Sequence, residues 1–191
     1  MIKKTFAGLA AAAATLVVTG TAQAQIPAIT PFSFEVRGGA AIPTGDLSGD
    51  RDAEPGLALG ATATLHFIPL VGVYGGYSRA QFGAGGDGEY TDQGIDVGLR
   101  LGIPTPLIPI DPWIKAGLTY HSLEASGFTL PVNNFEADAS LGYEVGAGLG
   151  FGFGPLSLTP GISWVSYDYD AGASDERASF VRVDIGARVR L

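Results

Sequence analysis

The chain has 191 residues, of which 29 are glycine and 12 are proline, yet 46% of its residues are hydrophobic. This composition excludes a helical bundle, because Gly and Pro are unfavourable inside helices, and it excludes a disordered chain, because such chains are poor in apolar residues. Cysteine is absent, which leaves no spacing for structural zinc, iron–sulfur clusters or disulfides, and the net charge of −8 disfavours nucleic acid. We therefore expect a Gly-rich, acidic β protein without a cofactor.

The first 24 residues have the features of a secretory signal peptide. Two lysines form a basic n-region, residues 6–18 form an apolar stretch, and Ala22-Gln23-Ala24 supplies a cleavage site with small residues. The apolar stretch is shorter than the roughly 20 residues that a membrane-spanning helix needs. We predict that residues 1–24 are removed and that residues 25–191 form the exported domain.

Downstream, apolar residues alternate with polar or small residues, which is typical of β-strands with two unlike faces. In the cleanest run, 94–103, five aliphatic residues alternate with Asp96, Gly98, Arg100 and Gly102. The pattern predicts eight strands, at 32–42, 57–67, 71–82, 94–103, 113–122, 141–153, 156–164 and 181–191.

The connections between these strands alternate between long and short. Long polar segments occupy 43–55, 83–93, 123–139 and 168–179, and short turns occupy 68–70 and 154–155, with the Pro-rich segment 104–112 as a longer member of the short class. This pattern indicates an all-β fold, an eight-stranded antiparallel up-and-down barrel. One end of the barrel is then a short-turn rim, where the first strand begins and the last one ends, and the other is a long-connection rim.

Alternation alone leaves two barrels open, a soluble one with an apolar cavity and a transmembrane one with an apolar exterior. The interior of an eight-stranded barrel is just wide enough for side chains to fill. The polar face consists mostly of Gly, Ser and Thr, so only this face fits inside. Aromatic residues mark both ends of the strands, as in the interfacial girdles of membrane barrels: Phe32, Phe34, Phe67, Phe151 and Phe153 at the short-turn ends, and Tyr77, Tyr120, Tyr143 and Trp164 at the long-connection ends.

With these features the chain resembles the small eight-stranded outer-membrane β-barrel family of the OmpA/OmpX type. Its last strand, residues 180–191, resembles the C-terminal signal that the outer-membrane assembly machinery reads, although Leu191 stands where Phe or Trp is usual. The resemblance implies a monomer in the outer membrane of a Gram-negative-type bacterium. Its partners would be outer-membrane lipid, lipopolysaccharide and the assembly machinery.

The predicted inner face carries charged residues that must be paired, because an unpaired buried ion is costly. They are Glu35, Arg37, Asp96, Arg100, Lys115, Glu144, Arg182, Asp184, Arg188 and Arg190. Antiparallel closure brings Glu35 near Arg188, and Arg37 closer to Asp184. We predict a salt-bridge network that plugs the lumen, the alternative being a charged conduction path.

The predicted function is structural or surface-interacting, without enzymatic activity. One alternative is a narrow porin-like channel or a transporter for small hydrophobic compounds. The other is a lipid A-modifying enzyme that uses His121 and Ser122. Adjacent strand residues face opposite sides, so these two cannot share a proton directly.

Three further features of the sequence carry weaker expectations. Arg79 falls on the outward face of its strand beyond Tyr77, where it is expected to contact lipopolysaccharide phosphates, the alternative being a bulge that turns it inward. His66 is expected to be a polar filler of the lumen. The acidic long connections, for example residues 50–54, are expected to be a solvated surface, the alternative being a divalent-cation site.

Overall fold

A computed structural model describes residues 32–49, 52–68, 70–84, 88–103, 105, 110–127, 135–170 and 175–191. The predicted signal peptide, residues 1–24, lies outside the described residues, as do Asp50 and Arg51 of the acidic segment. Among the described residues, no helix is long and apolar enough to cross a membrane.

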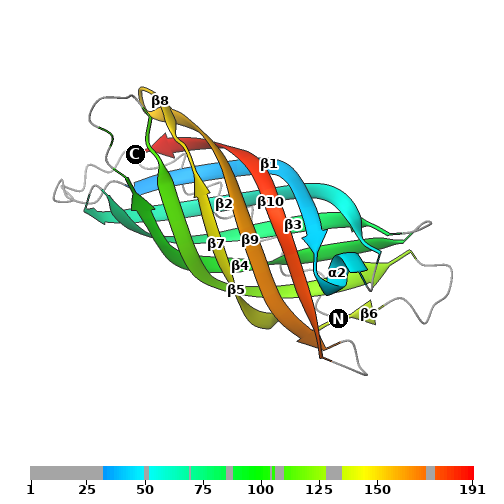
Figure 1. Ribbon diagram of the computed structural model, residues 1–191. Helices are drawn as coiled ribbons and strands as arrows, with labels where there is room; N and C mark the ends of the chain where they lie inside the picture. The colour runs from blue at the N-terminus through cyan, green and yellow to red at the C-terminus, as the bar shows by residue number, and fades with distance from the viewer. Residues whose placement is uncertain are drawn as a thin grey trace, which may run out of the picture.

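Eight antiparallel strands follow one another around a closed barrel (Figure 1). They are β1 (Phe32–Thr44), β2 (Glu54–Ile68), β3 (Val71–Gly83), β4 (Glu89–Gly102), β5 (Trp113–Ser126), β7 (Ser140–Gly148), β9 (Leu156–Asp170) and β10 (Asp175–Arg190). Pairing of β10 with β1 closes the barrel, so every strand finds two neighbours and the sheet has no continuous free edge. The predicted up-and-down barrel is therefore confirmed. Short elements decorate its ends, namely α2 (Asp46–Gly49), β6 (Phe135–Glu136) and β8 (Phe151–Phe153).

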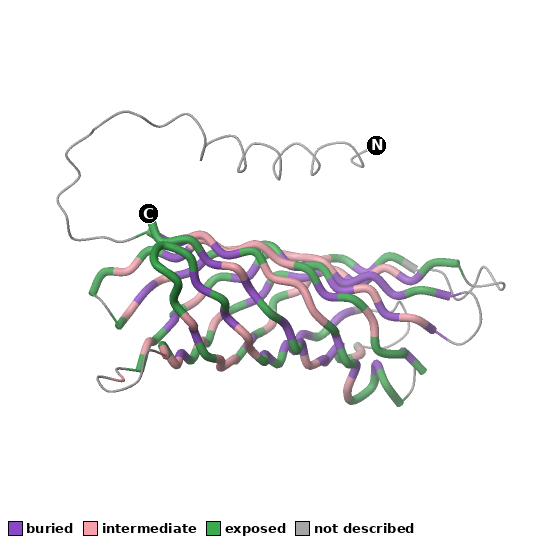
Figure 2. Tube along the Cα trace, turned by 90° about the horizontal axis from the view of Figure 1, so that it is seen from above, coloured by how far each residue is buried: buried purple, intermediate pink, exposed green. Residues whose placement is uncertain are grey.

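The two faces of the strands point as the sequence predicts. Large apolar side chains face outward and are about half exposed, such as Leu59 at 54%, Ile95 at 55% and Leu118 at 53%. The small and polar residues that alternate with them face the lumen, and Figure 2 shows the resulting alternation of exposed and more buried positions along the strands. An apolar belt thus surrounds a polar interior, as a barrel in lipid requires.

The sixth predicted strand, 141–153, is not continuous. β7 ends at Gly148, and the chain then leaves its path because Gly150 exchanges two backbone hydrogen bonds with Asp111 of the Pro-rich connection, each 2.8 Å long. Only afterwards does β8 pair with β9. Residues 149–153, which alternation assigned to the sixth strand, therefore lie beside the Pro-rich connection that precedes β5.

Strands at the long-connection rim extend further than predicted. β4 begins at Glu89 instead of residue 94, β5 continues to Ser126, and β9 and β10 form a hairpin from Asp170 to Asp175. Several acidic residues predicted in loops therefore lie on strands. In these extensions most inward residues are apolar, Asp92 being an exception, and the outward ones are mostly polar, the reverse of the pattern that defines the membrane-facing part.

The inward residues of these extensions form an apolar cap inside the barrel. It is lined by Leu47, Phe82, Tyr90, Leu123, Val165, Tyr167, Tyr169 and Phe180, all at most 4% exposed. The rings of Phe82 and Phe180 meet edge to face at 5.3 Å across the interior. α2, which lies beside the first residues of β10 in Figure 1, adds Leu47 to the same core. The cap lies inside the barrel at its long-connection rim.

Candidate functional site

Below the apolar cap, the lumen holds a network of charged side chains, which is the candidate functional site. Its first group lies nearest the short-turn rim and is centred on Glu35. Arg188 donates to Glu35 Oε2 from Nε at 2.7 Å, Arg37 also donates to this carboxylate, and Arg100 approaches it at 3.4 Å. Arg37 in turn donates to Asp184 Oδ1 at 2.9 Å. Three cations thus share two carboxylates.

The second group is centred on Glu144 of β7, which is fully buried. Lys115 Nζ and Arg182 Nη2 donate to its Oε2 at 2.6 and 2.7 Å, and the hydroxyl of Tyr74 donates to its Oε1 at 2.6 Å. A buried carboxylate that accepts three donors, two of them charged, has its desolvation offset. This group ties β3, β5, β7 and β10 together across the lumen.

The third group lies directly beneath the apolar cap and is centred on His121. The Nδ1 of its ring is 2.9 Å from Asp92 Oδ1, and its Nε2 is 3.0 Å from Asp96 Oδ1. A neutral imidazole has only one N–H, so donation to carboxylates at both nitrogens requires the charged imidazolium form. Ser78 donates to Asp96 at 2.8 Å, and the hydroxyl of Tyr167 donates to Asp92 at 2.5 Å.

Strand register determines which luminal residues meet. Glu35 is the direct cross-strand partner of Arg188, and Arg182 also reaches from the second group to within 3.8 Å of Asp96 in the third. Glycines leave room for the large members: Gly98 and Gly117 lie opposite each other where the Tyr74 hydroxyl crosses the lumen.

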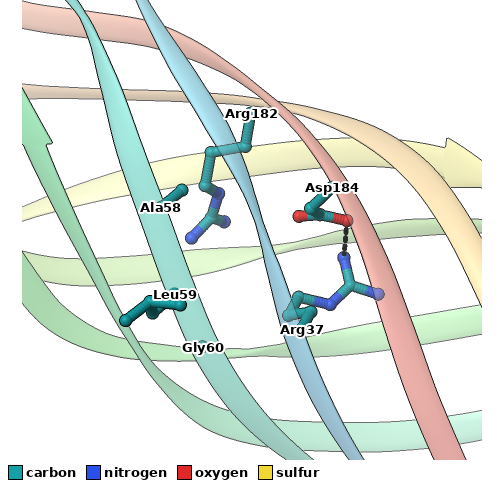
Figure 3. A pocket seen from close by; sticks show the side chains of 6 residues that line it. All are labelled: Arg37, Ala58, Leu59, Gly60, Arg182 and Asp184. Carbon is teal, nitrogen blue, oxygen red and sulfur yellow. Dashed lines mark hydrogen bonds and ion pairs between the residues drawn. The ribbon is translucent and has the colours of Figure 1, made fainter.

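A small cavity lies beside the charged network. This cavity of about 10 Å³, enough for about one water molecule, is lined by Arg37, Ala58, Leu59, Gly60, Arg182 and Asp184 (Figure 3). Figure 3 shows the ion pair between Arg37 and Asp184 at this cavity. Trp113 fills another part of the interior, with the Arg100 guanidinium 3.9 Å from the centre of its ring.

The structure brings together nine of the ten charged residues predicted for the lumen; Arg190 is the exception. Its side chain is half exposed and donates to Asp111 at 2.8 Å at the short-turn rim. The prediction was wrong for Arg190 because the Pro-rich connection places a carboxylate outside the lumen, next to the end of β10.

Several members of the network escaped the sequence analysis. Asp92 was assigned to a loop, although β4 continues past it and buries it to 1% exposure. Tyr74, Ser78 and Trp113 carry no formal charge, so alternation places them on the inward face but does not mark them as members of the network. Asp92 is separated from Asp96 and Arg100 by an even number of residues, so it lies on the same face of the strand. This spacing is the feature of the sequence that indicates its inward position.

The arrangement around His121 differs from a hydrolytic triad. Ser122 lies on the opposite face, and the serine that does approach the ring is Ser78, 3.5 Å from Nε2. Asp96 already occupies that nitrogen, and the fully buried imidazolium has no lone pair with which to accept a proton. His66 lies on the inward face of β2 and is half-buried.

On the outer surface of the described residues, two ion pairs lie outside the lumen, Arg177 with Asp168 and Arg190 with Asp111. Arg177 donates to Asp168 Oδ1 at 2.8 Å beyond the belt, and this hydrogen bond lowers the pKa of the Asp168 carboxyl. Arg79 is exposed on the outward face of β3. No group of three metal-ligating side chains occurs among the residues that the structure describes.

Comparison with solved structures finds other small barrels. The neisserial surface protein A barrel superposes with a TM-score of 0.69 at 15% identity, covering 84% of this chain and 97% of that one. The barrel of Ail, the attachment invasion locus protein of Yersinia pestis, gives a TM-score of 0.51 at 14% identity, with 85% and 97% covered. The N-terminal barrel domain of OprF from Pseudomonas aeruginosa gives 0.50 at 12% identity, with 83% and 97% covered.

These likenesses establish the shared fold. Among the curated proteins no relative matches this chain. The family model described as the outer membrane protein beta-barrel domain matches residues 10–155, more than half of the sequence. This match agrees with the closed barrel and its apolar belt, and the family implies the outer membrane of Gram-negative bacteria. The chain therefore belongs to the outer membrane protein beta-barrel domain family.

Proposed function

We propose that this protein is a closed outer-membrane barrel that acts through its structure and its outer surface rather than by conduction. The observation that carries the proposal is that the apolar cap and the ion-pair network follow each other along the lumen, and we infer that each of them seals it. The apolar cap fills the long-connection end, and the ion-pair network fills the part within the apolar belt.

The energetics favour a lumen that stays closed. Removing one partner of a buried, hydrogen-bonded ion pair costs on the order of 3–5 kcal/mol, and the network contains several such pairs that share partners. A conducting path through it would separate more than one pair at once. The cap would also have to expose Phe82, Phe180 and other side chains now fully buried.

Planar bilayer recordings of the refolded protein test this proposal. We expect no steady conductance above the lipid background, while a large porin inserted under the same conditions gives clear steps. Reproducible open-channel steps from monomeric protein would contradict the closed barrel and favour the narrow channel.

The structure offers less support to the other two functions. A transporter for small hydrophobic compounds needs a path into the lumen, and the cavity there holds about one water molecule. A lipid A-modifying enzyme needs a nucleophile that the substrate can reach, whereas Ser78 and His121 are buried beneath the cap. Mass spectrometry of lipid A from cells with and without the protein tests for catalysis, and we expect identical spectra.

We also infer that the last strand serves in assembly and that residues 1–24 are cleaved on export. Leu191 ends the closing seam, where its backbone N–H donates to Phe32 O at 2.8 Å and its side chain is 66% exposed. This is the outward position that an aromatic residue takes in the usual assembly signal. N-terminal sequencing of the exported protein should begin at Gln25.

A further inference from the structure

Arg79 differs from every other basic residue in the described part of the chain. Eight Lys or Arg side chains are described there, and seven lie within ion-pair distance of a carboxylate: Arg37, Arg100, Lys115, Arg177, Arg182, Arg188 and Arg190. Arg79 alone has no such partner. Its side chain projects outward and is exposed.

The position of Arg79 is the edge of the apolar belt. On β3 it follows Tyr77 on the same outward face, and its cross-strand neighbour on β2 is Leu59, which is 54% exposed. On β4 its neighbour is Gln93. A charged side chain at the boundary between lipid and water is favourable only when polar or anionic groups surround its head.

The residues beside Arg79 are hydrogen-bond donors. Gln93 accepts a hydrogen bond from the Tyr77 hydroxyl at its Oε1, 3.0 Å away, which directs the side chain and leaves its two amide hydrogens to donate. Ser122 of β5 is the next cross-strand neighbour of Gln93. Arg79, Gln93 and Ser122 thus form one outward row across β3, β4 and β5, which we call the donor row.

The surroundings of the donor row indicate one kind of ligand. Below it, the belt presents exposed aliphatic side chains, among them Val97 at 50% and Leu99 at 53%. Above it, the next row contains Thr91 and Glu124, and Glu89 accepts hydrogen bonds from Gln81 and Thr91. A soluble anion would have to approach past these acids on a chain of net charge −8, whereas a lipid reaches the row from within the membrane.

We propose that the donor row binds a phosphate of a lipid A headgroup in the outer leaflet. The long-connection rim of such barrels faces the cell exterior, so the row lies at the headgroup level of that leaflet. The planar guanidinium of Arg79 donates to two phosphate oxygens, and the amide of Gln93 donates to a third. The Ser122 hydroxyl, which donates to the Gln93 backbone oxygen at 3.5 Å, exchanges this long hydrogen bond for one to the phosphate. The acyl chains lie against the aliphatic side chains of β2 to β4. This site goes beyond the closed-barrel role and does not depend on whether the lumen conducts.

Native mass spectrometry of the refolded barrel in zwitterionic detergent tests the site. The probes are bisphosphorylated lipid A and the same lipid after enzymatic removal of its phosphates. For the wild-type protein we expect about tenfold tighter binding of the phosphorylated lipid, the effect of one charge-assisted hydrogen-bonded contact. Arg79→Ala should abolish this preference, and Arg79→Lys should keep part of it, because lysine retains the charge without the planar fork.

Two variants make the test specific. Arg177→Ala removes another exposed arginine that already has Asp168 as its partner, so it should bind both lipids as the wild type does. Gln93→Leu keeps every charge and removes only the amide, and it should weaken binding of phosphorylated lipid A about threefold. Heat-modifiable gel mobility verifies that each variant is folded.

Three outcomes would overturn the proposal. The first is an unchanged preference in Arg79→Ala, and the second is equal binding of the two lipids by the wild type. The third is displacement of lipid A by an equal concentration of inorganic phosphate, which would assign the donor row to a free anion instead of a lipid headgroup.

Discussion

At the scale of single residues, several luminal glycines lie where a bulky side chain crosses the barrel, and others lie where the backbone of the neighbouring strand comes close. A Cβ atom on Gly148 would lie 2.5 Å from Cζ2 of Trp113, and one on Gly98 would lie 2.8 Å from the Tyr74 hydroxyl. No real side chain tolerates such distances, so Trp113 and Tyr74 can occupy the lumen only because the residues that face them are glycine. The sequence showed the small inner face but not which large residue each glycine accommodates.

The first prediction compares an inward with an outward glycine. Gly148→Ala should lower the free energy of unfolding by about 1–3 kcal/mol, because the added methyl group overpacks the lumen against Trp113. Gly75 is the matched control, since it lies on the outward face and its nearest neighbour would be 4.0 Å from an added Cβ. Urea unfolding in detergent micelles measures both. Equal effects of the two substitutions would show that the lumen is not tightly packed there.

The second prediction concerns the pair of Glu35 and Arg188. Glu35→Ala leaves three guanidinium groups without a shared carboxylate and should destabilise the barrel by about 3–5 kcal/mol. Arg188→Ala should cost less, because Glu35 keeps Arg37 and Arg100 as partners. The double variant should cost less than the sum of the two.

The same unfolding measurements include a control and a contrary result. Arg190→Ala removes a half-exposed pair with Asp111 and should change stability by no more than about 1 kcal/mol. Strict additivity of Glu35→Ala and Arg188→Ala would mean that the two side chains do not interact in the folded barrel.

At the scale of the strands, sequence alternation predicts the part of each strand that faces lipid but not the part that extends into water at the long-connection rim. In β4, residues 95–101 alternate with apolar side chains outward, and this part was predicted correctly. From Glu89 to Gln93 the strand continues with the same parity, but its exterior meets water and its interior meets the apolar cap, so Tyr90 points inward. Apolar-out alternation alone therefore places the start of β4 five residues too late.

The third prediction follows from this division of β4. Phe82→Ala removes one ring of the Phe82–Phe180 contact and should loosen the cap without disturbing the belt. Hydrogen exchange should accelerate for residues 89–92 and 166–169 while residues 95–101 keep their protection. Uniform acceleration along β4 would mean that cap and belt unfold as one unit.

The fourth prediction concerns the end of β10. Leu191→Phe places an aromatic side chain beside Phe32, where the short-turn girdle lies, and restores the usual terminal residue of the assembly signal. We expect a larger folded fraction in the outer membrane at equal expression, read from the heat-modifiable gel band, and little change in the unfolding midpoint. Leu191→Ser is the opposite control and should lower that fraction. An unchanged folded fraction in both variants would mean that residue 191 does not influence assembly into the outer membrane.

At the scale of the whole molecule, the sequence predicts the barrel that surrounds the site better than the contacts between the side chains inside it. Composition, alternation and connection lengths together determine an eight-stranded barrel with charges inside, because closure and lipid leave one arrangement of the two faces. The pairing of Asp92 with His121 and of Glu144 with Tyr74 depends on strand register and on the tilt of side chains across the lumen. Neither follows from the periodicity of a single strand.

The last prediction treats the two seals as independent barriers in series. Phe82→Ala with Phe180→Ala opens the cap but leaves the ion pairs in place. Glu144→Ala with Lys115→Ala leaves the cap and the net charge unchanged, but it removes the Lys115–Glu144 pair and the carboxylate that Arg182 and Tyr74 share. Each double variant should therefore show only background conductance in planar bilayers. The combined variant should show brief openings, because the cap and the Glu144 group are then both disrupted and only the Glu35 and His121 groups still cross the lumen. Conductance in either double variant alone, with folding verified by gel mobility, would mean that the remaining seal does not close the lumen.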